Sequence, residues 1–312
     1  MKSLTNYINE KMVYNKTNAS NYKYFPKTKK ELQDIIAKRI IDKGNDVDLN
    51  DIDVSKITDM HMLFGQLPDF CGDVSEWDVS NVTDMSALFA DLRNFDCDLS
   101  NWNTSNVENM ANMFKRCTSF KGTGLKDWNV KNVRNTTSMF SNCINFNENL
   151  SKWKFDAIYN TSYMFAGCHK FTGEGLENWD ITNAVTVESM FLSCNKFNID
   201  VSNFKICGKT DSLHRLFQYC LSFEGKGLDK WVLHKSLSYI DSMFEGCPNL
   251  DSKYLVNWDL SSTKIKDISY MFADCPKFKG NLLNDWKLNK DTTMYSAFTN
   301  CFSKPDWYIE EE

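Results

Sequence analysis

Apolar residues recur along this chain with a period of 25 to 28 residues. One phenylalanine series shows successive spacings of 25, 25, 26, 25, 26, 26, 27, 28 and 26 residues. A tryptophan, or Ile52 or Phe204 in its place, lies 12 to 14 residues before each of these phenylalanines. The series comprises Phe64, Phe89, Phe114, Phe140, Phe165, Phe191, Phe217, Phe244, Phe272 and Phe298. Self-similarity at a fixed period indicates stacked repeats, so we predict ten tandem units that fill residues 46–301.

Each unit contains two kinds of apolar spacing, as "DVSEWDVSNVTDMSALFADLRNF" (residues 73–95) illustrates. Trp77 and Val79 alternate with polar residues, which is typical of a short strand. Val82 and Met85 begin a series with steps of three and four residues, which is typical of a helical turn with one buried face. We therefore predict an α/β fold: a leucine-rich-repeat solenoid with a short parallel strand and a short helical turn in each unit.

A helix is predicted before the array, over "TKKELQDIIAKRIIDKG" (residues 28–44). Thr28 and Glu31 form a capping-box pattern, and Gly44 is a typical helix end. An apolar stripe on this helix would cover the open end of the first unit, so residues 26–45 are interpreted as a capping helix. The stripe comprises Leu32, Ile35, Ile36, Ile40 and Ile41.

The two ends of the chain are treated as separate segments. Residues 1–25 are asparagine-rich in their second half and are interpreted as an N-terminal segment and tether. Trp307 and Tyr308 suit a C-terminal cap within residues 302–312, which finish with an acidic tail.

Two stretches carry a resemblance to a known family. "EWDVSNVTDMSALF" (76–89) and "NWNTSNVENMANMFKRC" (101–117) resemble the BspA-like leucine-rich repeat surface proteins. The match is best to the W-D-V-S-N-V-x-x-M-x-x-M-F-x-x-C subtype found in mycoplasma variable surface lipoproteins, and it covers roughly 80% of the chain. The resemblance implies a repeat scaffold with no catalytic signature, in a family whose members usually act at cell surfaces as adhesins or matrix binders. The opening "MKSLTNYINEKM" is similar to the starts of bacteriophage structural proteins, which suggests a phage-encoded member.

Composition and charge restrict the range of possible functions and locations. The formal net charge of −5 argues against binding nucleic acid through phosphate neutralisation. No run of 18 apolar residues is present, so no membrane insertion is expected. The start lacks the apolar stretch of a secretory signal. We therefore predict a cytoplasmic or virion-associated protein, with a cell-surface location only if a leader precedes this sequence.

Eight of the eleven cysteines stand three residues after the repeat phenylalanine. Leu67 and Leu92 occupy the same slot in the first two units, so the slot requires a hydrophobic side chain of modest size. No C-x-x-C pair exists, and a zinc site is not encoded. Cross-unit disulfides under oxidation remain open. The eight ladder cysteines are Cys117, Cys143, Cys168, Cys194, Cys220, Cys247, Cys275 and Cys301.

No residue pattern supports an enzyme. His61, His169, His214 and His234 occupy unrelated slots, and no G-x-S-x-G, H-E-x-x-H, P-loop or G-x-G-x-x-G sequence occurs. We predict no catalytic residue, no cofactor and no metal ligand. The tryptophan series is interpreted as core rather than as a sugar-stacking surface.

The residues on either side of each tryptophan are predicted to be exposed along the stacked strands. Their charge is acidic in the first four units and turns basic in the middle units, which is compatible either with a solvated face or with a partner-binding face. The candidate partner-binding residues are Asp51, Asp53, Glu76, Asp78, Asn101, Asn103, Asp127, Asn129, Lys152, Lys154, Asn178, Asp180, Asn203, Lys205, Lys230, Asp259, Asp285 and Lys287.

Two functions follow from these observations. The first is a non-enzymatic scaffold that recognises another protein through the exposed strand face. The second is a virion-associated structural or packaged cargo protein of a bacteriophage. The sequence leaves the identity of the partner and the oligomeric state open.

Overall fold

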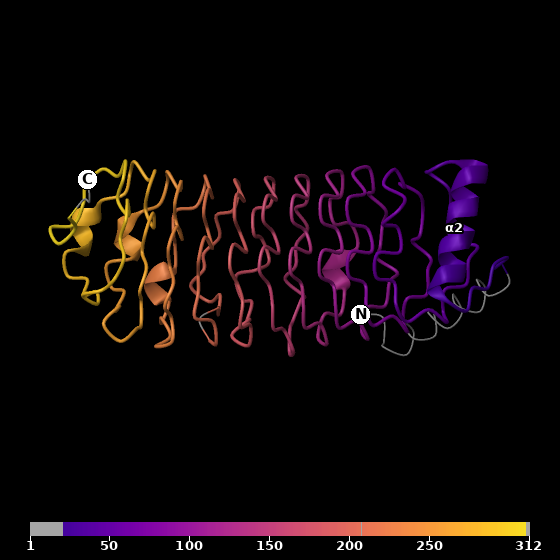
Figure 1. The fold of residues 1–312 in the computed structure, drawn as a ribbon, viewed down its shortest axis with the longest axis horizontal. Helices are drawn as coiled ribbons and strands as arrows, with labels where there is room; N and C mark the ends of the chain where they lie inside the picture. The colour runs from indigo at the N-terminus through magenta and orange to yellow at the C-terminus, as the bar shows by residue number, and fades with distance from the viewer. Residues whose placement is uncertain (1–20, 207, 310–312) are drawn as a thin grey trace, which may run out of the picture.

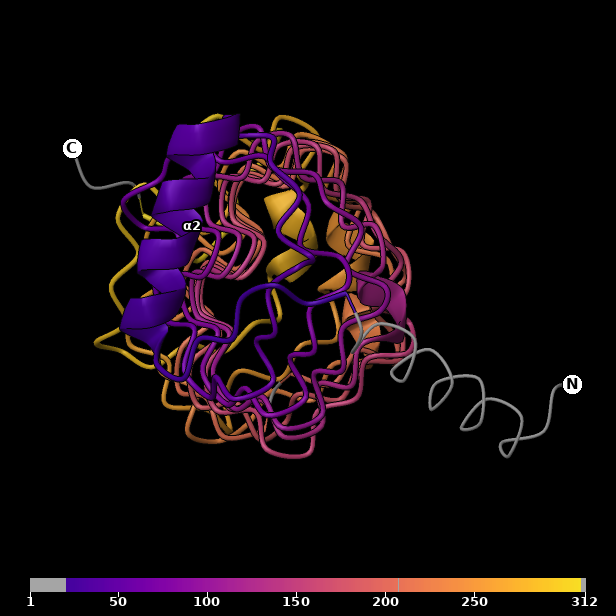
Figure 2. The ribbon, with the colours of Figure 1, turned by 90° about the vertical axis from the view of Figure 1, so that its right-hand side faces the viewer.

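The computed structural model describes residues 21–206 and 208–309 as a repeat solenoid (Figure 1). Successive rungs, each one sequence unit, stack along the long axis. Viewed down that axis, the rungs superimpose as one closed outline (Figure 2). Helix α2 (Lys29–Lys43) lies at the N-terminal end of the stack. Short 3-10 helices occur in one early rung, η1 (Leu125–Asp127), and in three late rungs, η2 (Leu228–Lys230), η3 (Ser252–Tyr254) and η4 (Gly280–Leu283).

Helix α2 begins and ends where the capping signals predict. The Thr28 hydroxyl accepts the Glu31 backbone N–H (3.2 Å), and Gly44 follows the last turn with φ 96°. Glu31 returns a bond to the backbone N–H of Lys27 rather than to that of Thr28. Leu32 and Ile36 are buried in the core shared with the first rungs.

The predicted apolar stripe of helix α2 is wrong at one position. Ile41 is 82% exposed, whereas Arg39 is 9% exposed and faces the solenoid. The Arg39 guanidinium donates to the Asp48 carbonyl oxygen (2.9 Å) and to the Asp51 carboxylate (3.2 Å). Burial of a cation costs little when the cation is paired and hydrogen-bonded in this way. Helix α2 therefore contacts the first rungs through a polar contact as well as an apolar one.

The methionine segment of each rung does not form the predicted helical turn. Ala87 (φ 53°) and Asp91 (φ 67°) are left-handed, which an α-helix does not allow. Alternate backbone N–H groups instead close tight turns, as from Leu88 to the Met85 carbonyl oxygen (3.2 Å). These turns bond residues three apart, so they reproduce the three- and four-residue steps that also characterise a helix.

The remaining N–H groups of this segment reach the next rung. Met85, Ala87, Phe89 and Asp91 donate to carbonyl oxygens of the segment that contains Met113, at 2.7 to 2.9 Å. Parallel bridges connect the same register through most of the solenoid, from Asp59–Asp84 to Asp267–Thr293. The described residues contain isolated bridges but no longer strand. Parallel pairing is thus concentrated on the methionine segment rather than on the tryptophan segment, where the strand was predicted.

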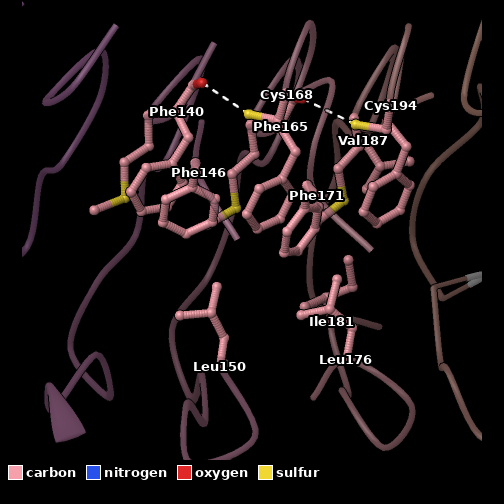
Figure 3. Close-up of a cluster of buried hydrophobic side chains, with 14 of the residues drawn as sticks. Phe140, Phe146, Leu150, Phe165, Cys168, Phe171, Leu176, Ile181, Val187 and Cys194 are labelled. Carbon is pink, nitrogen blue, oxygen red and sulfur yellow. Dashed lines mark hydrogen bonds between the residues drawn. The ribbon is translucent and has the colours of Figure 1, made fainter. Parts of the chain in front are cut away.

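Aromatic columns run through the core. The ten repeat phenylalanines from Phe64 to Phe298 stack on one another with ring centroids 5.2 to 5.9 Å apart. A second phenylalanine packs against the first within a rung, as Phe165 does against Phe171 at 4.4 Å (Figure 3). The last ring of the column, Phe298, contacts Trp307 and Tyr308. Burial of these rings supplies the main hydrophobic stabilisation between rungs.

Side-chain donors reinforce the stack in one direction. The indole N–H of Trp102 donates to the Val74 carbonyl oxygen of the preceding rung (3.0 Å). The other seven tryptophans of the series all donate in the same way. The thiol of Cys168 donates to the Phe140 carbonyl oxygen at 3.0 Å (Figure 3). Asn106 donates to the Ser80 carbonyl oxygen (2.7 Å). The predicted burial of the tryptophan series is confirmed, since its eight tryptophans are 9% exposed or less; Trp307 in the C-terminal tail is partly buried.

Glycine pairs precede the tryptophans of three alternate rungs in the middle of the array, at residues 122/124, 173/175 and 225/227. Gly124 (φ 92°) lies so close to the preceding rung that an added Cβ would be 2.3 Å from the Ser100 nitrogen and 2.7 Å from Asp98 Oδ1. Gly175 and Gly227 face the equivalent turns in the same way. Only glycine fits both the left-handed backbone and the short contact.

Candidate partner-binding surfaces

The candidate residues that follow each tryptophan hold local turns. The Asp78 carboxylate accepts the backbone N–H of Ser80 (3.1 Å), an Asx turn in which the side chain replaces a backbone acceptor. Six of the candidates make this contact, and their residue type therefore has a structural cause. They are Asp53, Asp78, Asn103, Asn129, Asp180 and Asp259.

The candidates that precede each tryptophan are partly paired between rungs. Lys152 contacts the Asp127 carboxylate of the preceding rung, and Asn101 donates to Glu76 (3.1 Å). Among the candidates that follow the aromatic residue, Lys205 pairs in the same way with Asp180 of the preceding rung, at 3.2 Å. The acidic and basic blocks along the sequence are therefore complementary between adjacent rungs. Exposed pairs of this kind contribute little to stability, about 0 to 1 kcal/mol each.

The chain's own N-terminal residues contact the first rung on this surface. Lys23 pairs with Asp51 (3.4 Å), and Tyr24 forms a parallel bridge with Ile52. Burial raises the pKa of Tyr22, with a further contribution from the charges of Asp53 and Asp78. The predicted N-terminal segment ends within this contact, because residues 21–25 lie along the solenoid. Residues 1–20 lie outside the described residues.

Five of the eighteen candidates are exposed and have no hydrogen-bond or ion-pair partner among residues 21–206 and 208–309. They are Lys154, Asn178, Asn203, Asp285 and Lys287. We call these five residues the tryptophan-flank surface. The charge of Lys287 helps to lower the pKa of Asp259, but no contact within the described structure accounts for the residue types of the other four.

The ladder cysteines are buried as predicted at seven of eight positions, and Cys301 is partly buried. Burial raises the pKa of Cys168 well above its usual range, which keeps its thiol protonated. The sequence interpretation was incomplete, because each ladder thiol also donates to the preceding rung. A leucine in the same slot fills the space without supplying that donor.

Two histidines have partners that the sequence spacing does not reveal. His214 Nδ1 contacts the Asp241 carboxylate of the next rung, and His61 Nδ1 lies 2.8 Å from the Ser86 hydroxyl. Both pairs join equivalent positions of adjacent rungs. Among the described residues, no group of three or more histidine, cysteine or acidic side chains could hold a metal ion.

The sequence reasoning missed a second surface on the methionine segments of the later rungs. Four exposed tyrosines lie there, at 40 to 50% exposure: Tyr219, Tyr239, Tyr270 and Tyr295. We call these four residues the tyrosine patch. A weak signal was present, because most other rungs carry a small or polar residue at the positions of Tyr219 and Tyr270, with Tyr163 as an earlier tyrosine at the latter. The helical interpretation of this segment concealed which positions share a face.

None of the described helices has the length and apolar character needed to cross a membrane.

Comparisons with known proteins relate to the whole array. The model of a family described as "Mycoplasma protein of unknown function, DUF285" matches residues 31–143, 119–231 and 211–306. Among solved structures, the chain is similar to a chain in the crystal structure of the TLR13–ssRNA13 complex, with a TM-score of 0.27 and 12% identity. That match covers 81% of this chain and 44% of the solved chain, so this chain spans less than half of the other's length. No curated protein matches the sequence.

Proposed function

Because the chain belongs to the Mycoplasma DUF285 family, we propose that it is a non-enzymatic repeat scaffold that recognises another protein through exposed side chains of its rungs. The family match spans most of the repeat array, and a repeat solenoid offers an extended surface for such contacts. We include in this proposal ten units over residues 46–301, capped by residues 26–45 and 302–312. The proposed subtype is the BspA-like repeat of mycoplasma surface lipoproteins.

One observation carries the proposal. The repeated slots of each rung are occupied by contacts within the solenoid: phenylalanine rings stack, and tryptophan and cysteine donors reach the preceding rung. The tryptophan-flank surface makes no such hydrogen bond or ring contact, yet it presents charged and amide side chains on three consecutive rungs, with Lys154, Asn178 and Asn203, and on the last rung. Exposed side chains that serve no internal contact are free to be selected for binding.

Site-specific crosslinking tests this proposal. A photoreactive phenylalanine analogue would replace Asn178 or Asn203 in the protein expressed in its native cells, with Ile41 on the outer side of helix α2 as the matched exposed control. We expect one protein to crosslink from Asn178 and Asn203 but not from Ile41. Equal crosslinking from all three positions, or none from any, would contradict recognition through this surface.

The virion-associated alternative remains a prediction, since no feature of the described residues favours it. Mass spectrometry of purified phage particles would test it, because a packaged protein must be recovered with the capsid proteins.

A further inference from the structure

The tyrosine patch is held in place by its own surroundings. The Tyr219 hydroxyl donates to the Glu245 carboxylate (2.8 Å), and its ring packs against Gly246 of the next rung. An added Cβ at Gly246 would lie 2.2 Å from Tyr219 Cδ1, so no larger residue leaves room for the ring. Tyr270 and Tyr295 contact each other edge to face, with centroids 5.3 Å apart. The rings of Tyr219, Tyr270 and Tyr295 are therefore ordered on the surface before any partner arrives.

Two of these tyrosines adopt a backbone conformation that disfavours large side chains. Tyr219 (φ 59°) and Tyr270 (φ 57°) are left-handed, a conformation that glycine and asparagine adopt at lower cost. Some equivalent positions carry such residues, for example Gly167 and Asn112, but Arg116 and Tyr163 are left-handed there as well. The left-handed backbone is therefore a feature of the repeat, and the later rungs differ in carrying exposed tyrosines on four neighbouring methionine segments.

The charge around the patch has one dominant sign. The four methionine segments that carry the patch are residues 211–219, 238–246, 266–274 and 293–300. They contain five carboxylates, Asp211, Asp241, Glu245, Asp267 and Asp274, and two permanent cations, Arg215 and Lys266. Asp241 already contacts His214, and Glu245 already accepts from Tyr219. The net excess of carboxylates still repels phosphate groups and attracts cations.

Together, these observations point to one kind of partner. We propose that the four segments bind an arginine-rich stretch of a partner protein, whose guanidinium groups stack on the tyrosine rings and pair with the neighbouring carboxylates. Guanidinium groups are suited to both contacts, because they are planar, permanently charged and weakly hydrated. The inference rests on the proposed function in that the ligand is a protein, but it concerns a surface distinct from the tryptophan-flank surface.

Fluorescence anisotropy with a labelled nonaarginine peptide in 0.15 M salt tests the proposal on the full chain. The test variants are Tyr270→Asn and Tyr295→Ser, separately and together. Tyr163→Asn is the matched control, because Tyr163 occupies the same rung position as Tyr270, is also left-handed (φ 58°) and is 38% exposed. All these variants keep the net charge, so general attraction between the peptide and an acidic protein stays the same.

We expect each patch substitution to weaken peptide binding roughly fivefold, the loss of one cation–π contact, and Tyr163→Asn to leave it unchanged. Asparagine tolerates the left-handed backbone, so Tyr270→Asn should melt no lower than the wild type. Weakened binding together with retained stability separates a binding role from a structural one.

Equal peptide affinity of the patch variants and the Tyr163→Asn control would overturn the proposal. Binding of a neutral glucose hexasaccharide or a uridine nonanucleotide, in place of the peptide, would overturn it as well and indicate the other ligand class. Neither result would alter crosslinking from Asn178 and Asn203, so failure of this inference is distinguishable from failure of the proposed function.

Discussion

Cysteine alkylation under native conditions provides a quantitative test of the rung geometry. The structure orders the thiols by accessibility: Cys71 is exposed, Cys97 and Cys301 are intermediate, and the other seven ladder cysteines are buried. Iodoacetamide attacks the thiolate, so its rate depends on both access and pKa. We therefore expect three separate rate classes rather than one.

The magnitude follows from the pKa of Cys97. Burial raises it to about 12, with the charge of Asp73 adding to the effect. At pH 8, an ordinary thiol with a pKa of about 8.5 is roughly 25% thiolate, whereas a pKa of about 12 leaves about 0.01%. A thiolate with a higher pKa is also more nucleophilic, by roughly 25- to 60-fold over this pKa difference. This gain in nucleophilicity partly compensates for the smaller thiolate fraction. Native Cys97 should therefore react about 40- to 100-fold more slowly than the same residue in the unfolded chain.

The buried ladder thiols should be slower again. Cys168 is fully buried and donates to the Phe140 carbonyl oxygen, so reagent reaches it only when its rung opens. Its alkylation rate should fall further in the presence of an osmolyte that is excluded from the protein surface, because such an osmolyte stabilises the folded state and suppresses opening of the rung.

Quantitative peptide mass spectrometry after timed quenching measures each cysteine separately. Alkylation in concentrated guanidinium chloride is the internal control, because all cysteines should then react at similar rates. If native Cys168 reacted as fast as native Cys71, the thiol would not lie in the core and the stacked-rung geometry would be refuted.

Four further results are expected. Trp153→Phe should reduce the free energy of unfolding by about 1 to 2 kcal/mol in urea titrations, because it removes a buried donor to the preceding rung; no loss would mean that this donor is dispensable. Ile36→Ala should cost about 2 to 4 kcal/mol, whereas the matched change Ile41→Ala should stay within about 0.5, since only Ile36 is buried; similar losses would contradict the placement of helix α2. Burial raises the pKa of Asp84, but hydrogen bonds from its own turn outweigh it and the net shift is downward. Its stabilisation is then complete above the unfolded pKa of about 3.9 and is lost as pH falls through the lower folded value, so Asp84→Asn should lose less stability than the wild type between pH 5 and pH 3. A chain that starts at residue 26 should melt below one that starts at residue 21, because Tyr24 pairs with the first rung; identical melting temperatures would argue against that contact.

The buried positions could be predicted from the sequence because burial leaves a periodic apolar pattern. The phenylalanine and tryptophan slots required no knowledge of the backbone, and Leu92 in place of a ladder cysteine identified that slot as core. The capping signals around Thr28 and Gly44 are local, so they also fixed the bounds of helix α2.

The backbone of the methionine segment could not be predicted in the same way. Steps of three and four residues fit both a helix and a series of tight turns, and the two differ in where the N–H groups go. Phe89 donates to Met113 rather than to a residue four positions back. That choice is determined by a segment one unit away, which local spacing does not reveal.

The prediction of the candidate surface from the sequence was incomplete for the same reason. A single unit shows Lys152 as a free charge, whereas its ion-pair partner Asp127 lies one unit earlier in the sequence. The tyrosine patch combines residues from four rungs, and each tyrosine stands at a different position of its methionine segment. Both features belong to the stack and not to any one repeat.

The alternation of glycine pairs has a consequence for how this gene can change length. Gly124, Gly175 and Gly227 each fit against an Asx or polar turn of the rung before them, and the intervening rungs supply those turns. Within this central part of the array, loss of one unit would place two rungs of the same kind in contact, whereas loss of two adjacent units would keep each glycine pair against such a turn. We therefore expect related arrays to gain or lose units in pairs across this central part.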